Sequence, residues 1–358
     1  MKILAQGISG PVLITGHTGF KGTWLTYLLQ ELGVDVVGYS LPALSDSLYS
    51  TASRLGCIQE DFGDIRNYER IESFISTTKP SHIIHLAAQP LVLDSYKEPI
   101  KTFSTNVLGT ANLLEACRKK SFIKSISVAT TDKVYRNNDA ETKFKETDPL
   151  EGQDPYSASK VATEAVVAAW RNILKDESDA KIVALRAGNV IGGGDFSRNR
   201  LVPDCVRAHM NKTHVVIRRP LSTRPWQHVL DPLLGYLLAG QLAQADSYNF
   251  GPTDDLSLTV QEVVSELQKT IKFEYQIQND DNAPYEANFL SLDSTLARRD
   301  LGWRCQFDQL GAINLTGDWW LRKFKGEPAQ DITESQVKEF ASNLVLADTV
   351  RQKSPTLD

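Results

Sequence analysis

Tyr156 and Lys160 have the residue types and the spacing of an acid–base pair. The run from Tyr156 to about Ile173 is rich in Ala and Val and contains no Gly or Pro, so it is predicted to be a buried helix. Side chains at positions i and i+4 of a helix project from the same face. A lysine ammonium at that distance favours the phenolate of a tyrosine, whose pKa is otherwise about 10. The pair therefore predicts a base for a sugar or alcohol hydroxyl, although a packed Tyr beside a snorkelling Lys has the same spacing.

A second group of reactive side chains, from Thr130 to Tyr135, follows the strand expected at 123–128. Ligands of open parallel sheets gather at the carboxyl ends of the strands. Thr131, Asp132 and Lys133 place a hydroxyl, an acid and a base at such an end, which predicts a site; a solvated turn is the alternative. The segment 186–195 is too rich in glycine to be core. The segment 218–228 is rich in arginine and aromatic residues, which suit phosphates and a base or sugar; a solvent-facing basic loop is the alternative.

The glycine-rich segment Gly16–Gly22 lies between a strand at 12–15 and a helix that ends near Gly33. A further strand follows at 34–39, and this order turns a glycine pattern into a dinucleotide fingerprint. Glycines let the backbone approach a pyrophosphate, whose charge is stabilised by the amides of the helix N-terminus. The second strand ends in Tyr39–Ser40–Leu41 without an acidic residue for the ribose, so these residues leave NAD and NADP open. Asp64 is a candidate acceptor for the adenine amino group, or part of a plain turn.

Strands and helices alternate as far as Leu185, including a helix at 101–119 with Asn106 in its interior and Gly109 at a close approach. This alternation predicts an α/β fold, a Rossmann-type doubly wound parallel sheet. The pattern then changes to a smaller C-terminal substrate-binding lobe, which includes a helix over 257–270 and the segment 287–293. Thr333 with Gln336 predicts a capping box for a last helix. We assign residues 1–185 to the NAD-binding domain, completed by 226–252, and 186–358 mainly to the lobe for the nucleotide sugar.

Composition narrows the class of protein. A chain of 358 residues with a net charge of −5 and a pI near 5.8 is not expected to bind nucleic acid or an anionic membrane. No apolar run approaches the length that spans a bilayer. The four cysteines, Cys57, Cys117, Cys205 and Cys305, form no metal-binding spacing and are expected to be reduced. We expect a cytoplasmic protein without a metal.

Seven strings of residues together resemble the extended short-chain dehydrogenase/reductase superfamily of nucleotide-sugar enzymes. Within it they are similar to the NAD-dependent epimerase/dehydratase family, and most of all to its CDP-glucose 4,6-dehydratases. The resemblance runs from about Val12 to about Phe340. The strings are Gly16–Gly22, His85–Pro90, Thr131–Lys133, Tyr156–Lys160, Arg186–Asp195, Leu201–Cys205 and Thr223–His228.

This resemblance implies a lyase that converts CDP-glucose to CDP-4-keto-6-deoxyglucose and water, for the deoxysugars of surface polysaccharides such as lipopolysaccharide. Tyr156 would take the C4 hydroxyl proton while NAD accepts the C4 hydride, and Thr131 would hold the C4 oxygen. Asp132 would protonate the departing C6 hydroxyl, and Lys133 in its neutral form would take the C5 proton. A homo-oligomer, dimer or tetramer, is also implied.

The resemblance further implies which residues bind the cofactor and the substrate. His17 and Lys21 stand where smaller or neutral residues are common in related branches, which implies altered cofactor binding. The contacts implied for NAD are Gly16, His17, Gly19, Phe20, Lys21, Gly22, Asp64, Ile65, Leu86, Ala87, Ala88, Asn106, Tyr156 and Lys160. Those implied for the nucleotide sugar are Gln89, Tyr135, Asn189, Leu201, Val202, Arg218, Arg224 and His228.

Three other functions fit part of the pattern. A nucleotide-sugar 4-epimerase shares the fold and the Tyr/Lys pair, but it needs no acid and base at C6 and C5, so Asp132 and Lys133 argue against it. A 4,6-dehydratase for another nucleotide-hexose stays open. A non-catalytic NAD-binding regulator could dispense with Tyr156 or Lys160, and both are present.

Overall fold

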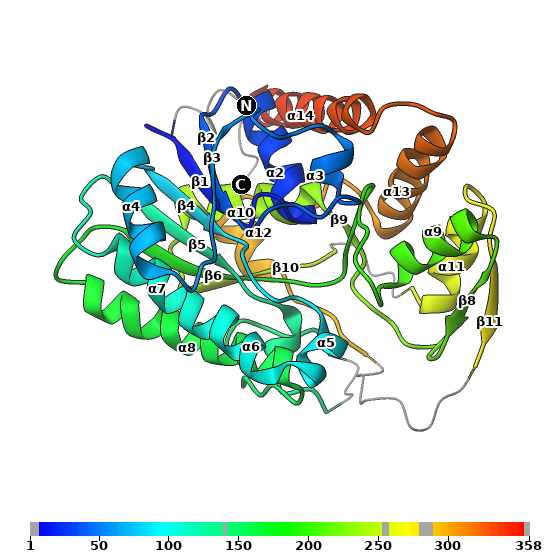
Figure 1. The fold of residues 1–358 in the computed structure, drawn as a ribbon, viewed down its shortest axis with the longest axis horizontal. Helices are drawn as coiled ribbons and strands as arrows, with labels where there is room; N and C mark the ends of the chain where they lie inside the picture. Colours follow the sequence, from blue (N-terminus) through cyan, green and yellow to red (C-terminus); the bar gives the residue numbers. More distant parts are fainter. Residues whose placement is uncertain (1–6, 139–141, 253–257, 279–288, 354–358) are drawn as a thin grey trace.

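The computed structural model describes residues 7–138, 142–252, 258–278 and 289–353. Within these ranges, seven parallel strands form one sheet in the order β10-β6-β5-β4-β1-β2-β3 (Figure 1). The order reverses between β1 and β4, as in doubly wound folds, and this confirms the predicted Rossmann-type sheet. The strands are β1 (Val12–Thr15), β2 (Val36–Ser40), β3 (Gln59–Phe62), β4 (His82–His85), β5 (Ser125–Ala129), β6 (Lys181–Ala187) and β10 (Ser247–Phe250).

Helices cover both faces of the sheet, because alternate residues of each strand are buried on opposite sides. Val12 and Ile14 of β1 belong to one hydrophobic core, and Leu13 between them belongs to the other. One face carries α2 (Phe20–Glu31), α3 (Leu48–Thr51), α10 (Leu230–Leu242) and α14 (Ala329–Lys353) (Figure 1). The opposite face carries α4 (Tyr68–Thr78), α5 (Val92–Lys97), α6 (Pro99–Phe103), α7 (Gly109–Cys117) and α8 (Pro155–Leu174).

The helix expected at 101–119 contains a π-helical turn, η1 (Ser104–Leu108), between α6 and α7. Asn106 lies in this turn and is 1% exposed. A π turn inside an α-helix often marks a functional position. Gly109 follows, and a Cβ added there would lie 2.6 Å from Cγ2 of Ile65, which confirms the predicted close approach.

A smaller lobe lies beside the sheet (Figure 1). It contains α9 (Leu201–Asn211), β8 (His214–Ile217), α11 (Val260–Gln268), β11 (Glu274–Ile277) and α13 (Gln309–Phe324). Two short strands, β7 (Val190–Ile191) and β9 (Gln227–His228), pair in parallel and join the loops between sheet and lobe. The chain then returns to the sheet, where β10 pairs with β6 and α12 (Thr295–Leu301) packs on α10.

The capping box predicted for the last helix is wrong. α14 begins at Ala329, and Thr333 lies inside it, donating its hydroxyl to the Ala329 carbonyl at 2.7 Å and accepting from Trp319 Nε1 at 3.0 Å. Gln336 donates to the Leu315 carbonyl instead of closing a cap. Residues 287 and 288 of the segment expected at 287–293 lie outside the described residues. Among the described helices none is long and apolar enough to cross a bilayer.

Candidate active site

The first turns of α8 hold Tyr156 and Lys160 in the interior. Asp154 caps the helix: its carboxylate accepts from the backbone N–H of Tyr156 at 2.9 Å and of Ser157 at 3.0 Å, and Pro155 occupies the first helical position. Tyr156 is 8% exposed and Lys160 6%. The cap fixes where the helix begins and therefore which face presents the pair.

The electrostatic setting of Tyr156 differs from the prediction. Burial raises the pKa of Tyr156 to about 12, while the charge of Arg200 and a hydrogen bond with Thr131 oppose this rise. Lys160 instead donates to the Ala129 carbonyl at 3.0 Å, and burial lowers the pKa of Lys160 to about 8. The sequence did not indicate Arg200 as a site residue, because this arginine stands before α9 outside every motif described above.

The carboxyl group of Asp132 lies in a short 3₁₀ turn, η2 (Asp132–Val134), directly after β5. Thr131 Oγ1 donates to Asp132 Oδ1 at 3.0 Å, and Asp132 is 2% exposed. Burial raises the pKa of Asp132, opposed by Lys133, by Thr131 and by the charges of Arg224 and Lys21. A carboxyl that keeps its proton to a higher pH than an exposed aspartate is suited to donate that proton.

Two loops from the lobe side close onto this acid. A Cβ added at Gly188 would lie 2.3 Å from Cγ of Pro225 and 3.1 Å from Oδ2 of Asp132. Only glycine therefore fits between the two. The neighbouring Arg224 is 4% exposed and donates through Nη1 to the Thr223 carbonyl at 2.7 Å. The structure thus brings the loops 186–195 and 223–228 to the carboxyl end of β5.

The glycine loop between β1 and α2 has the geometry of an anion cradle. Gly16 has φ +78°, and a Cβ on Gly22 would lie 2.2 Å from the Gly16 carbonyl oxygen, so strand and helix pack with backbone against backbone. The N-cap residue of α2 is Gly19, which offers no side-chain acceptor, and the first turn contains no acidic residue. The positive end of the helix is therefore available to a pyrophosphate.

Lys21 adds a cation from this loop to the acid–base cluster. Its Nζ donates to the hydroxyl of Tyr236 on α10 at 3.2 Å. Burial lowers the pKa of Lys21 to about 7, and the charges of Arg200 and Lys160 contribute to that lowering, whereas Asp132 opposes it. Lys21 therefore gives up its proton at a lower pH than an exposed lysine does.

β2 ends beside hydroxyl side chains, at the position where an acidic residue would bind the ribose of a dinucleotide. Thr18 Oγ1 lies 2.7 Å from Ser40 Oγ, and Thr18 also donates to the Leu41 carbonyl. His17 is fully buried and its Nε2 lies 2.8 Å from Glu60 Oε2, so its ring faces away from the loop surface. Burial lowers the pKa of His17. The Thr18–Ser40 pair has no counterpart among the predicted contacts.

Asp64 and Ile65 follow β3 at the edge of the sheet, and the small residues after β4 lie at the point where the strand order reverses. The Asp64 carboxylate accepts from Arg66 at 2.6 Å, which lowers its pKa. Ile65 is 5% exposed, whereas the segment Leu86–Ala88 is partly exposed at the carboxyl end of β4. Ala87 N lies 2.8 Å from the position of a Cβ on Gly16, so this segment packs directly on the glycine loop.

Asn106 and Gln89, two residues predicted to contact ligands, hydrogen-bond to the loop after β4. The Asn106 side chain accepts from the Gln89 backbone N–H at 2.8 Å and donates to the Gln89 carbonyl and to Ser159 Oγ. The Gln89 side chain accepts from Leu91 N at 2.6 Å and donates to Thr102 Oγ1 at 2.9 Å. Asn106 thus orients the loop after β4, and the Gln89 amide is bound to that same loop. Direct contact of either residue with a ligand stays a prediction.

Tyr135 and His228 also point away from the loops. Tyr135 is 2% exposed, donates to Asn249 Oδ1 and accepts from Arg186 Nη1, both at 2.7 Å. His228 is fully buried between the rings of Trp24 and Phe307, and burial lowers its pKa to about 3. The polar groups of both residues face the core, and contact of either residue with substrate stays a prediction.

The remaining predicted substrate contacts lie around the lobe. Leu201 and Val202 begin α9, partly exposed and buried respectively, and the Asn189 carbonyl accepts from the Gln227 backbone N–H at 3.0 Å. Arg218 is exposed at the end of β8. In the part of the chain described here, no group of three His, Cys, Asp or Glu side chains is placed to hold a metal ion.

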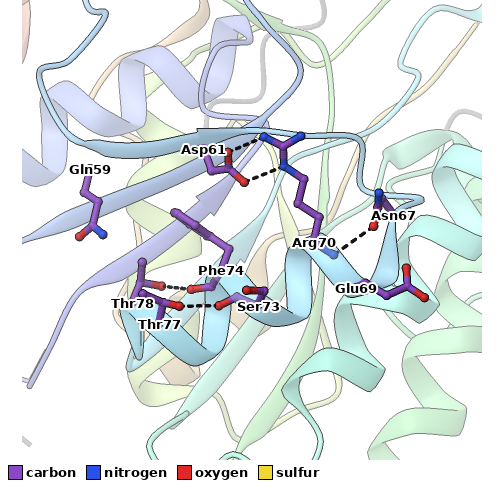
Figure 2. Close-up of a pocket in the computed structure, with 9 residues that line it drawn as sticks. All are labelled: Gln59, Asp61, Asn67, Glu69, Arg70, Ser73, Phe74, Thr77 and Thr78. Carbon is purple, nitrogen blue, oxygen red and sulfur yellow. Dashed lines mark hydrogen bonds and ion pairs between the residues drawn. The ribbon is translucent and has the colours of Figure 1, made fainter.

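A groove of 460 Å³ lies at the edge of the sheet, between β3 and α4. Figure 2 shows Arg70 paired with Asp61 at 2.7 Å and the hydroxyls of Thr77 and Thr78 turned onto carbonyls of their own helix. None of the acid–base or glycine-loop residues lines it. The groove is therefore separate from the site described above.

The proteins to which this chain is similar are nucleotide-sugar dehydratases and epimerases. Residues 13–312 match the family model described as GDP-mannose 4,6 dehydratase. A CDP-glucose 4,6-dehydratase of Salmonella typhimurium strain LT2 is 37% identical over 344 residues, which cover 92% of this chain and 96% of the relative. The UDP-glucose 4-epimerase of Thermus thermophilus in complex with NAD has a TM-score of 0.76 at 25% identity, over 87% of this chain and 98% of that one. A dTDP-glucose 4,6-dehydratase of Bacillus anthracis in complex with NAD has a TM-score of 0.74 at 22% identity, over 91% of this chain and 100% of that one.

Proposed function

This chain belongs to the NAD-dependent epimerase/dehydratase family of nucleotide-sugar enzymes, and on that premise we propose that it is a CDP-glucose 4,6-dehydratase. It would convert CDP-glucose to CDP-4-keto-6-deoxyglucose and water. The observation that carries the proposal is the buried Asp132, held by Thr131 beside Tyr156, with its pKa raised by burial. An acid in that position serves the loss of water and has no task in an epimerisation.

The residues of the glycine loop fit a dinucleotide. The uncapped start of α2 suits its pyrophosphate, and the hydroxyls of Thr18 and Ser40 suit the ribose nearest the end of β2. Bound there, NAD would supply the hydride acceptor for C4, the hydride donor for C6 and a positive ring whose field favours the phenolate of Tyr156. A relative bound to NAD supports this assignment.

The chain's own residues then move protons. Tyr156 takes the C4 hydroxyl proton as that carbon is oxidised, and Thr131 donates a hydrogen bond to the C4 oxygen. The ketone acidifies the C5 hydrogen, which Lys133 removes, while Asp132 protonates the C6 hydroxyl that departs as water. C6 is then reduced and C5 regains a proton, so the cofactor is restored and the sugar has lost one water.

We assign the nucleotide and pyrophosphate of the substrate to the loops that close onto Asp132. Arg224, buried beside Pro225, offers a planar cation for the pyrophosphate, and Asn189 offers its amide. Leu201 and Val202 at the start of α9 would flank the base. The relative named for CDP-glucose supports cytidine over other bases.

The decisive experiment supplies CDP-glucose, dTDP-glucose and UDP-glucose separately and measures product mass. Loss of one water from CDP-glucose, faster than from the others, is expected. A product of unchanged mass from every sugar would instead favour the 4-epimerase. Deuterium at C4 of CDP-glucose should reappear in the C6 methyl group, and its release to solvent would contradict the mechanism.

A further inference from the structure

The acid–base segment after β5 is anchored to one buried ion pair, formed by Glu164 of α8 and Arg186 of β6. Arg186 Nε donates to Glu164 Oε1 at 2.8 Å, and its Nη2 donates to Oε2. The side chains of Arg186 and Glu164 are 5% and 7% exposed, respectively. A buried pair of this kind is weak evidence for stability, because apolar residues of similar volume often serve a fold equally well. The hydrogen bonds that the pair makes to other groups therefore indicate its role better than its stability does.

The pair holds both ends of the segment 130–135. At the first end, Thr130 Oγ1 donates to Glu164 Oε1 at 2.7 Å. At the other, Arg186 Nη1 donates to the Tyr135 hydroxyl at 2.7 Å, and that hydroxyl donates onward to Asn249 of β10. The three residues assigned to the chemistry of dehydration lie between these two anchors.

The same carboxylate also acts on the catalytic helix. Tyr156, Lys160 and Glu164 follow one another at intervals of four residues on α8, so they share one face. The negative charge of Glu164 raises the pKa of Lys160 against the effect of burial. One carboxylate therefore serves both the acid–base segment and the lysine one turn away.

We propose that Glu164 and Arg186 are positioning residues, which hold the acid–base segment 131–133 against the face of α8 that presents the catalytic tyrosine and lysine. Neither touches substrate; they act through Thr130 and Tyr135. The proposal rests on the proposed function for its kinetic consequence, but its structural consequence is independent of any substrate.

The test replaces the pair without leaving an unpaired buried charge. In Glu164→Met/Arg186→Met, apolar side chains fill the site, so we expect a melting temperature close to that of the wild type. Glu164→Gln and Arg186→Met alone are expected to be less stable. The matched control is Glu177→Gln, which breaks the partly exposed pair that Glu177 forms with Arg118 at 2.7 Å, with two hydrogen bonds of the same kind.

In the double variant kcat for water loss from CDP-glucose should fall about 100-fold, the scale of a small misplacement of reacting groups, with KM nearly unchanged. Amide hydrogen exchange of the peptide covering 130–135 should become faster in that variant and not in the control. A double variant with wild-type melting, wild-type kcat and unchanged exchange would overturn the proposal. If the wild type releases no water from CDP-glucose, the proposed function fails, and the exchange measurement still decides whether the pair holds the segment.

Discussion

The ammonium of Lys21 lies 3.2 Å from the hydroxyl of Tyr236, although the two residues are 215 positions apart. The contact joins the first turn of α2 to α10, and it brings a cation of the glycine loop within the electrostatic reach of Asp132 and Lys160. The charge on Lys21 is therefore coupled to Asp132 and Lys160, the groups to which we assign the chemistry.

NAD binding should strengthen as the pH rises through about 7. Burial and neighbouring cations lower the pKa of Lys21 to about 7, so its ammonium is present below that pH and lost above it. On the proposed placement of NAD the nicotinamide ring would lie toward Lys160 and Asp132, the groups within electrostatic reach of Lys21, so the ammonium would repel that positive ring. In Lys21→Met, NAD affinity at pH 6 should rise roughly 10-fold, equal to about 1.4 kcal/mol, and change little at pH 9. Calorimetric titration at both pH values checks this.

NADH is the matched ligand for that measurement, because its nicotinamide ring carries no positive charge. Its affinity should depend much less on pH and on Lys21. A wild-type protein that binds NAD equally well at pH 6 and pH 9 would show that the lysine exerts no such repulsion.

Asp132→Asn should block elimination while sparing oxidation at C4. The amide keeps the shape of the side chain but has no proton to give to the C6 hydroxyl, and loss of one general acid typically costs 10²–10⁴-fold, so we expect about 1000-fold. Because burial raises the pKa of Asp132, the wild-type rate should fall as pH rises and the carboxyl ionises. Mass spectrometry of the product across pH checks both statements; an unaltered pH profile in the variant would exclude this acid.

Lys133→Met should leave C4 oxidation partly intact and prevent removal of the C5 proton. Wild-type protein in D₂O should place deuterium at C5 of the product, which NMR detects. The variant should produce no dehydrated sugar and exchange no C5 hydrogen. Full turnover by the variant would remove Lys133 from its assigned role.

Asp231, at the start of α10, should make the fold less stable as pH rises. Burial raises its pKa to about 7, whereas an unfolded aspartate titrates near 3.8, so the folded state binds the proton more tightly. The stability from this group is complete below about pH 4, falls up to about pH 7 and is level above. Asp231→Asn should lack this fall, and at pH 8 its free energy of unfolding should exceed that of the wild type by about 3 kcal/mol. Urea unfolding from pH 4 to pH 8 measures the difference, and parallel curves would contradict it.

The sequence predicted the sheet because strands such as Val12–Thr15 combine β-branched residues with glycine breaks, and these local signals survive in the structure. It also predicted the Tyr156–Lys160 pair and the position of Asp132 at a strand end. Helix spacing shows which face two residues share, but it does not show what surrounds that face. Arg200, whose charge opposes the rise in the pKa of Tyr156 caused by burial, comes from a loop of the lobe 44 positions further along.

Four of the side chains that the resemblance assigned to ligands have surroundings in the structure that the sequence did not predict, all for one physical reason. Polar side chains such as Asn106 and Tyr135 look available in a sequence, yet each is satisfied by a partner distant in the chain. His228 likewise follows an arginine and a tryptophan but packs between two rings. Burial of a polar group depends on tertiary packing, so local pattern cannot distinguish a ligand contact from a core hydrogen bond.

Gly22→Ala should strongly destabilise the fold, whereas Gly19→Ala should act mainly on ligand binding. A Cβ at Gly22 would lie 2.2 Å from the Gly16 carbonyl and 2.6 Å from the His17 Cα, and backbone atoms cannot move away cheaply. We expect a loss of about 3 kcal/mol, measured by urea unfolding. At Gly19 the nearest atom is the Gly16 carbonyl oxygen at 3.3 Å, a tight contact that needs a shift of only a few tenths of an ångström, so the loss of stability should be much smaller than in Gly22→Ala. The methyl group stands at the uncapped start of α2, where a pyrophosphate would approach. NAD affinity should therefore fall in Gly19→Ala with a much smaller change in the free energy of unfolding than in Gly22→Ala. Equal NAD binding by Gly19→Ala and the wild type would place the dinucleotide elsewhere.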